Sequence, residues 1–243
     1  MQRLLALICL CLLARPASAA NPDVLWNLLH DKCVPAFQAG TPPAPCDRVV
    51  LPPDAPSGWV LLKDLEGVAQ YLLLPTQKIT GIEDPAILAP GEPNFFAEAW
   101  RARGLVSAKL GRDLPRNATS LAVNAPGGRS QNQLHIHIDC VRPEVMQALA
   151  GFDAPGGTIT LLGHPYRARR LDGTDLADNP FTLLAADPAA GPDDMGRHTV
   201  VVVGETFPDG RDGFVMLDGK VDLIVGQRGN GEELQDHSCA AVR

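Results

Sequence analysis

One short run of alternating residues constrains this chain more than any other feature. Between residues 134 and 140, apolar and polar side chains alternate strictly, which is the period of a strand with one buried face. The apolar set consists of Leu134, Ile136 and Ile138. On the opposite face lie His135, His137 and Asp139. The pattern therefore predicts a rigid strand that presents two adjacent imidazoles on one side.

Two neighbouring imidazoles suit three roles that their spacing alone does not separate. They could chelate a metal ion, since His-x-His on a strand brings both rings to one side. A neutral imidazole could instead attack phosphorus and form a phosphoramidate that water later cleaves. The third alternative is a polar sheet face without chemistry.

Turn residues and periodicity place the remaining elements. Helices are expected over 24–34, over one long segment opened by Pro93 and closed by Gly111, and over 143–149. Strands are expected at 59–62, 71–74, 120–124, 134–140, 158–162, 199–203, 214–217 and 221–225. Short strands divided by one long helix predict an α+β fold with an antiparallel sheet and packed helices. No convincing internal repeat or linker is visible, so one domain is expected over 20–243, with a core at about 57–145 and a strand-rich part at about 152–243.

The N-terminus has the features of an export signal. Arg3 precedes an apolar run, Leu4–Ala14, and the run is followed by the small residues Ala17-Ser18-Ala19. As a helix, such a run would rise about 16 Å, roughly half the thickness of a bilayer's hydrocarbon core. A cleaved signal peptide over 1–19 and an exported, periplasmic protein are therefore expected.

Four cysteines remain after the signal: Cys33, Cys46, Cys140 and Cys239. In an exported chain they predict two disulfides, with three pairings open. We favour Cys33–Cys46, which closes a short proline-rich loop and leaves Cys140–Cys239 as a long-range bridge. The four cysteines lack the closely spaced pairs that are typical of a zinc site. The net charge of −7 argues against a nucleic-acid partner.

The residues around the histidines resemble the histidine triad (HIT) superfamily of nucleotidyl hydrolases and transferases. Asn124 and Gln131 precede His137 at the superfamily's spacing, and the segment from Gln70 to Ile79 resembles its strand ending in a Pro-x-x turn. The chain is still more similar to the CDP-diacylglycerol pyrophosphatase family, a bacterial branch, from about residue 24 to 239. The sequence words that carry this similarity are Leu25-Trp26, Cys33-Val34-Pro35, Pro45-Cys46, Val60-Leu61-Leu62-Lys63-Asp64, Gln70-Tyr71-Leu72-Leu73, Pro93-Asn94-Phe95-Phe96, Gln131-Asn132, His135-Ile136-His137-Ile138 and Gln235-Asp236-His237-Ser238-Cys239.

The resemblance implies a HIT-like fold and a role for each matching residue. His137 would attack the phosphorus bearing the cytidine and release phosphatidate, after which water would release CMP; His135 would orient the transferred group. The residues implied in substrate binding are Asn124, Gln131, Asn132, Ser130, Lys78 and Asp64, the last of these at the ribose. The resemblance implies neither a metal nor another cofactor.

Two positions depart from the HIT pattern. Asp139 stands where typical members carry a third His or Gln, and Gln70 stands where they carry a further His. Asp139 could take part in substrate binding as a proton acceptor if burial raised its pKa. Otherwise we expect it to turn towards Arg142 or solvent.

The expected partner is a lipid-linked nucleotide at a membrane surface, which for an exported protein is the inner membrane. A homodimer is a further expectation, because HIT-like proteins often pair. The cluster formed by His164, Arg167, Arg169 and Arg170 could bind a lipid phosphate or be a solvated strand. The rival functions are hydrolysis or transfer on other nucleotide pyrophosphates, a non-catalytic binding module for nucleotide or lipid, and a metal site.

Overall fold

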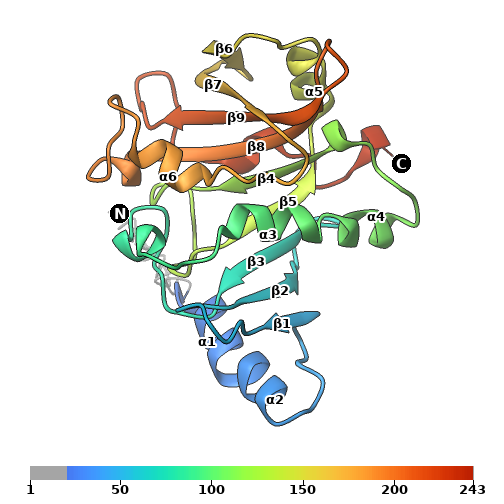
Figure 1. Cartoon of the computed structure of the whole chain (residues 1–243), viewed down its shortest axis with the longest axis vertical. Helices are drawn as coiled ribbons and strands as arrows, with labels where there is room; N and C mark the ends of the chain where they lie inside the picture. Colours follow the sequence, from blue (N-terminus) through green and yellow to red (C-terminus); the bar gives the residue numbers. More distant parts are fainter. Residues whose placement is uncertain (1–20, 243) are drawn as a thin grey trace, which may run out of the picture.

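Nine strands form one antiparallel sheet, in the order β1-β2-β3-β5-β4-β8-β9-β7-β6 (Figure 1). This computed structural model describes residues 21–242, so the expected signal peptide over 1–19 lies outside the described residues. The strands are β1 Arg48–Val50, β2 Trp59–Lys63, β3 Tyr71–Pro75, β4 Thr119–Val123, β5 Ile136–Cys140, β6 Gly156–Leu161, β7 His164–Asp172, β8 His198–Thr206 and β9 Asp212–Lys220. Together with the helices they confirm the expected α+β class.

The two halves of the sheet repeat one connectivity that the sequence does not reveal. In each half a hairpin is followed by a helix and a second hairpin: β2-β3-α3-β4-β5, then β6-β7-α6-β8-β9. The halves meet where β4 pairs with β8. In the second half, β9 corresponds to the histidine strand β5. On the face of β9 that corresponds to the histidine face of β5, Val215 and Leu217 are buried in an apolar cluster, so the second half has no equivalent of the paired histidines.

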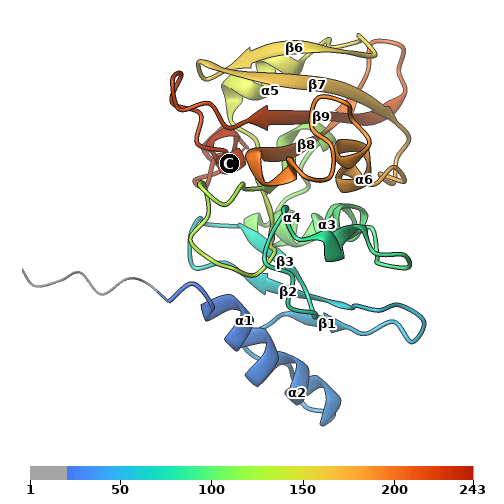
Figure 2. The same ribbon diagram turned by 90° about the vertical axis from the view of Figure 1, so that its left-hand side faces the viewer.

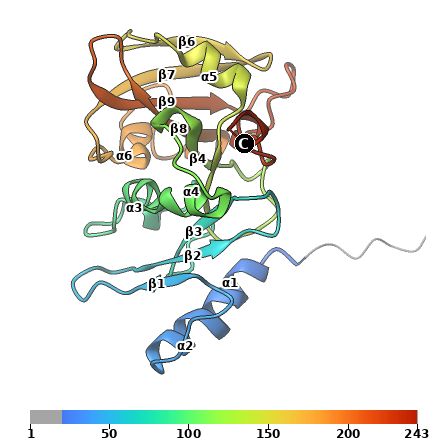
Figure 3. The same ribbon diagram turned by 90° about the vertical axis from the view of Figure 1, so that its right-hand side faces the viewer.

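Helices cover the two faces of the sheet differently. Figures 2 and 3 show α3, α4 and α6 on one side of it and the connection from β4 to β5 on the other. The helices are α1 Val24–Leu28, α2 Val34–Gln38, α3 Phe95–Ala102, α4 Gly104–Leu110, α5 Pro143–Leu149 and α6 Pro180–Ala185. Within residues 21–242, no helix is long and apolar enough to cross a membrane.

The face opposite α3 carries two separate apolar clusters. One lies under α5 and includes Val145 and Leu161. The other packs β1–β3 against the helical segment 24–38 and includes Leu29 and Leu72. The histidine strand, β5, runs between these clusters, so its polar face is open to a cavity rather than covered by a helix.

Three expected elements differ in the structure. The long helix is interrupted at Arg103 and continues as α4; glycine at 104 weakens a helix interior at this point. Strand β5 begins two residues later than expected, at Ile136. The strand expected over 221–225 is wrong: Asp222 and Gln227 instead pair across a tight hairpin, whose turn is held by the Asp222 side chain accepting from the Ile224 N–H at 2.9 Å.

Candidate active site

The register of the sheet places the two histidines together. His137 lies opposite Leu72 on β3 and Ala122 on β4, and His135 precedes the same strand. Their ring centroids are 4.7 Å apart and the rings are nearly perpendicular. The alternation in the sequence therefore predicted the shared face correctly.

Both rings line a cavity of about 650 Å³. Six of the nine residues that the sequence suggested line this cavity: His135, His137, Asn124, Gln131, Ser130 and Asp64. Three do not: Lys78, Asn132 and Asp139. Lys78 instead pairs with Asp23 at 3.2 Å near the Trp26 ring, and the backbone N–H of the exposed Asn132 donates to the Pro22 carbonyl at 2.6 Å.

The Nδ1 atom of His137 contacts two polar side chains that come from distant parts of the chain. Glu232 Oε2 lies 3.0 Å away and the Gln70 amide nitrogen lies 2.6 Å away. Gln70 Nε2 also donates to Glu232 Oε2 at 3.2 Å. The other ring nitrogen, Nε2, is buried and has no hydrogen-bond partner among residues 21–242. The Glu232 carboxylate, an acceptor, suits a hydrogen on Nδ1 and a lone pair on Nε2, whereas the Gln70 amide nitrogen, a donor, suits the opposite tautomer. The negative charge of the carboxylate favours the first of these two tautomers.

Asn124 fixes the position of Glu232. Its amide nitrogen donates to Glu232 Oε1 at 2.6 Å, and its oxygen accepts from the backbone N–H of Gly231 at 2.8 Å. Asn124, which the resemblance implies in phosphate binding, therefore also binds the Glu232 carboxylate beside His137. Sequence reasoning missed Glu232, although it lies shortly before the Gln235–Cys239 word that contributed to the resemblance.

Asp139 turns neither to Arg142 nor to solvent, and this expectation is corrected. It is fully buried, its Oδ2 lies 2.7 Å from His237 Nδ1, and its Oδ1 accepts from the Cys140 N–H at 2.8 Å. His237 in turn places Nε2 3.9 Å from Glu232 Oε2. The third position of the triad is therefore connected to His137 only indirectly, through His237 and Glu232.

Burial sets the protonation of these groups. It lowers the pKa of His135, and it lowers the pKa of His137 well below the usual imidazole value, with His135 and His237 adding to the effect. Burial raises the pKa of Glu232. The hydrogen bond to Asp139 raises the pKa of His237. At neutral pH the two cavity histidines are therefore neutral, as a nucleophile or a base must be.

Arg129 is the cation that lines the cavity, and sequence reasoning gave it no role. Its guanidinium forms two hydrogen bonds with Glu83, Nη1 to Oε2 at 2.7 Å and Nη2 to Oε1 at 2.5 Å. Its Nε is buried without a partner in the described residues. Gly81 permits this packing, because a Cβ there would lie 2.2 Å from Arg129 Nη1.

The turn before β5 provides backbone donors on the same side. The N–H groups of Arg129, Ser130 and Gln131 donate to no other atom of residues 21–242, and all three residues line the cavity. Unpaired backbone N–H groups in a turn form a concave anion site. Gln131 also contacts the N-terminal segment, since its Oε1 accepts from the Leu25 N–H at 3.2 Å.

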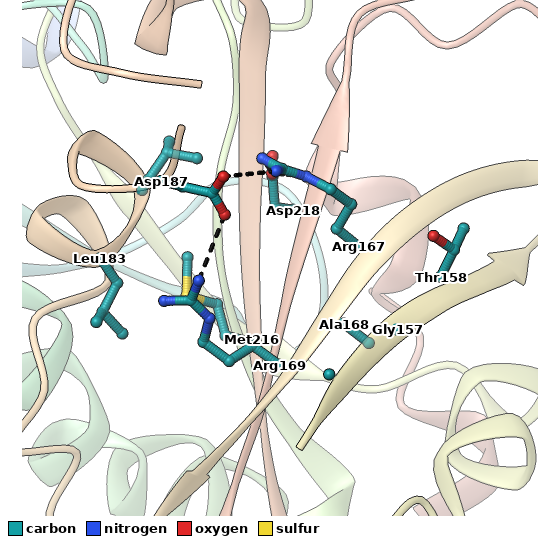
Figure 4. A pocket seen from close by; sticks show the side chains of 11 residues that line it. Gly157, Thr158, Arg167, Ala168, Arg169, Leu183, Asp187, Met216 and Asp218 are labelled. Atoms are coloured by element: carbon teal, nitrogen blue, oxygen red, sulfur yellow. Dashed lines mark hydrogen bonds and ion pairs between the residues drawn. The ribbon is translucent and has the colours of Figure 1, made fainter. Parts of the chain in front are cut away.

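The arginines after His164 lie away from this cavity. Arg167 and Arg169 reach Asp187 at 2.9 and 3.3 Å, and they line a separate cavity of about 340 Å³ beside α6 (Figure 4). Arg170 pairs with Asp172 and Asp209. Each arginine of the cluster is thus paired with carboxylates. His164 itself lies 2.8 Å from Glu233.

Both favoured disulfides are present, Cys33–Cys46 and Cys140–Cys239. The first ties the helical segment to the loop before β1. The second ties the end of β5 to the C-terminal segment that carries Glu232 and His237. The long-range bridge therefore holds the two parts of the site together.

The antiparallel sheet, the paired buried histidines and the cavity in front of them form a candidate active site. The family model described as CDP-diacylglycerol pyrophosphatase matches residues 20–243. A CDP-diacylglycerol pyrophosphatase from Yersinia pestis is 40% identical over 233 residues, which cover 92% of this chain and 86% of that protein. The chain belongs to the CDP-diacylglycerol pyrophosphatase family.

Proposed function

We propose that this protein hydrolyses the pyrophosphate of CDP-diacylglycerol to CMP and phosphatidate through a covalent nucleotidyl intermediate on His137. The observation that carries the proposal is the state of the His137 ring: Nε2 is unpartnered among the described residues, while Glu232 lies 3.0 Å from Nδ1. Family membership and the name of the Yersinia pestis relative support the choice of substrate.

In the first step the lone pair of His137 Nε2 forms a bond to the phosphorus that bears the cytidine. The bond from that phosphorus to the bridging oxygen breaks, and phosphatidate leaves with the electron pair. The ring now carries a positive charge, which Glu232 stabilises through the proton on Nδ1. Phosphatidate is a weakly basic leaving group, so this step needs no strong general acid.

In the second step water attacks the same phosphorus, the N–P bond breaks and CMP leaves. His135 would take the proton of that water. Its Nδ1 lies 2.6 Å from the Gln133 carbonyl, which can only accept, so Nδ1 carries the hydrogen and Nε2 is a free acceptor. The lowered pKa of His135 keeps this base neutral at neutral pH.

The cavity offers separate groups for the charges of the pyrophosphate. The free N–H groups of the turn at residues 129–131 would hold phosphate oxygens, and Arg129 would supply the positive charge that the sequence had suggested for Lys78. Asp64, which lines the other side of the cavity, would bind the ribose hydroxyls. These contacts would hold the phosphorus in line with His137 Nε2, which is the main work of such catalysis.

A lipid substrate also suits the expected location. We propose that the protein is exported and acts at the outer surface of the inner membrane, where its substrate would be embedded. The signal-like residues 1–19 support export. The homodimer expected from HIT-like proteins stays a prediction, to be measured by sedimentation.

The test is to trap the intermediate. Purified protein is mixed briefly with CDP-diacylglycerol labelled in the cytidine phosphate, and the reaction is quenched in acid or in base. We expect a label on His137 that survives base and is lost in acid. The His137→Ala variant should show no label and lose several orders of magnitude in turnover, whereas the exposed His30→Ala should match the parent protein.

Inversion at phosphorus without any label would contradict the covalent step. Parallel assays with CDP-choline and ADP-ribose test the substrate: faster turnover of either one would favour a general nucleotide pyrophosphatase. Retained turnover in EDTA is expected, since no step depends on a metal.

A further inference from the structure

The described chain exposes large apolar side chains at the tips of two turns. Leu65 is 100% exposed in the turn between β2 and β3, and Ile224 is 95% and Leu223 74% exposed in the hairpin after β9. Isolated exposed leucines are ordinary. Three such side chains at turn tips on the same side of the sheet instead favour contact with an apolar partner.

The β2–β3 turn borders the cavity that contains the histidines, since Asp64, Leu65 and Glu66 line it directly. The tip of the hairpin after β9 lines a different cavity of about 830 Å³ through Asp222 and Leu223. Only the base of this hairpin approaches the histidine cavity, where the Ala125 N–H donates to the Gly229 carbonyl at 2.8 Å, just before the cavity-lining turn. In Figures 2 and 3 both turns, together with the β4–β5 connection, lie on the side of the sheet away from α3.

The hairpin also extends this surface to a third turn. A Cβ on Gly226 would lie 3.7 Å from His164 Nε2, so the hairpin tip lies beside the β6–β7 turn. That turn carries the exposed Leu162. We call the side chains of Leu65, Leu162, Leu223 and Ile224 the apolar rim.

We infer that the apolar rim inserts into the surface of a phospholipid bilayer and holds the cavity mouth against it. The rim consists of convex turn tips, which can enter the boundary between headgroups and acyl chains. The tips are flanked by the acidic side chains of Asp64, Glu66 and Asp222. Binding of the rim to a bilayer would therefore depend on its apolar side chains and not on attraction to anionic lipid. The inference rests on the proposed function, because a diacylglycerol substrate would lie in such a bilayer.

Insertion is tested directly in the full-length chain, without reference to activity. Ile224→Trp and Leu65→Trp are mixed with vesicles of phosphatidylcholine carrying brominated acyl chains, and the fluorescence lost beyond that of the parent protein is measured. The matched control is Leu51→Trp: Leu51 is also exposed, at 36%, but lies in the β1–β2 connection on the opposite side (Figure 2). We expect quenching at 224 and 65 and none at 51. Equal quenching at all three positions, or at none, would overturn the inference.

A second experiment links insertion to catalysis. Leu223→Asp and Ile224→Asp should each lower kcat/KM on long-chain CDP-diacylglycerol in vesicles by about tenfold, the effect of losing one buried apolar side chain. On a short-chain, fully dissolved CDP-diacylglycerol they should match the parent protein, as should Leu51→Asp on both substrates. Equal losses on both substrates would assign the rim to the substrate pocket and overturn the inference. A change of oligomeric state without quenching would assign the rim to contact with a second copy of the chain and would also overturn it. A parent protein inactive on both substrates would contradict the proposed function, while the quenching result would stand separately.

Discussion

Glu232 Oε2 lies 3.0 Å from His137 Nδ1, although His137 lies on β5 and Glu232 follows β9, the last strand of the sheet. Glu232 is held from both sides, by Asn124 at Oε1 and by Gln70 at Oε2. A buried carboxylate beside Nδ1 fixes the tautomer of an imidazole that reacts through Nε2, and it stabilises the imidazolium cation. In the proposed mechanism this contact favours His137 over His135 as the nucleophile.

Glu232→Gln should reduce kcat about a hundredfold with little change in KM, because the lost charge acts mainly on the cation formed during the reaction. Steady-state kinetics over a range of pH measures both constants. Glu233→Gln is the matched control, since Glu233 contacts His164 and Tyr166 instead of His137. If the two variants were equally active, Glu232 would have no role in positioning His137.

The acid limb of the pH profile should lie below pH 6.5. Burial lowers the pKa of His137, so the folded enzyme binds this proton only below the usual imidazole range. Activity should stay level as pH falls to 6.5 and decline below it. The same shift destabilises the fold in acid, because the unfolded chain binds the proton first. A kcat/KM already halved at pH 6.5 or above would refute the neutral, buried state of His137.

Loss of the Cys140–Cys239 bridge should affect both stability and turnover. The double change to serine should lower the free energy of unfolding by roughly 2–5 kcal/mol and also lower kcat, because the bridge anchors the segment that carries Glu232 and His237. The matched pair is Cys33→Ser with Cys46→Ser, which should cost stability but leave kcat near the parent value. Urea unfolding and kinetics on both pairs give the comparison; a similar fall in kcat for both would argue against the anchoring role.

Glu205→Gln should stabilise the protein at alkaline pH. Burial on β8 raises the pKa of Glu205 to about 7, and its Oε1 has no partner in the described residues. An acid whose folded pKa is raised above its unfolded value costs stability as pH rises through that folded value. The variant should therefore melt roughly 2–6 °C higher at pH 8 and show little gain at pH 5. A gain of equal size at both pH values would point to packing instead of ionisation.

Local patterns account for much of what the sequence predicted correctly. The alternation around His137 set the shared face of the two histidines. Pro93 and Gly111 bracket the expected long helix, which the structure divides into α3 and α4. Where local signals compete, prediction was less successful. The apolar run at 221–225 resembles a strand, but the turn formed by Asp222 and the left-handed Gly226 overrides it.

By itself, the sequence determined the strand that displays the histidines and the family, because the first depends on residues close together and the second on whole-chain similarity. It favoured one set of cysteine pairs but left three pairings open, and the structure decided between them. Only the tertiary structure decided that Glu232 contacts His137, that Asp139 turns to His237 and that Arg129, in place of Lys78, lines the cavity. These contacts join segments far apart in the chain. Their geometry follows from sheet register and burial, which no local pattern of residues encodes.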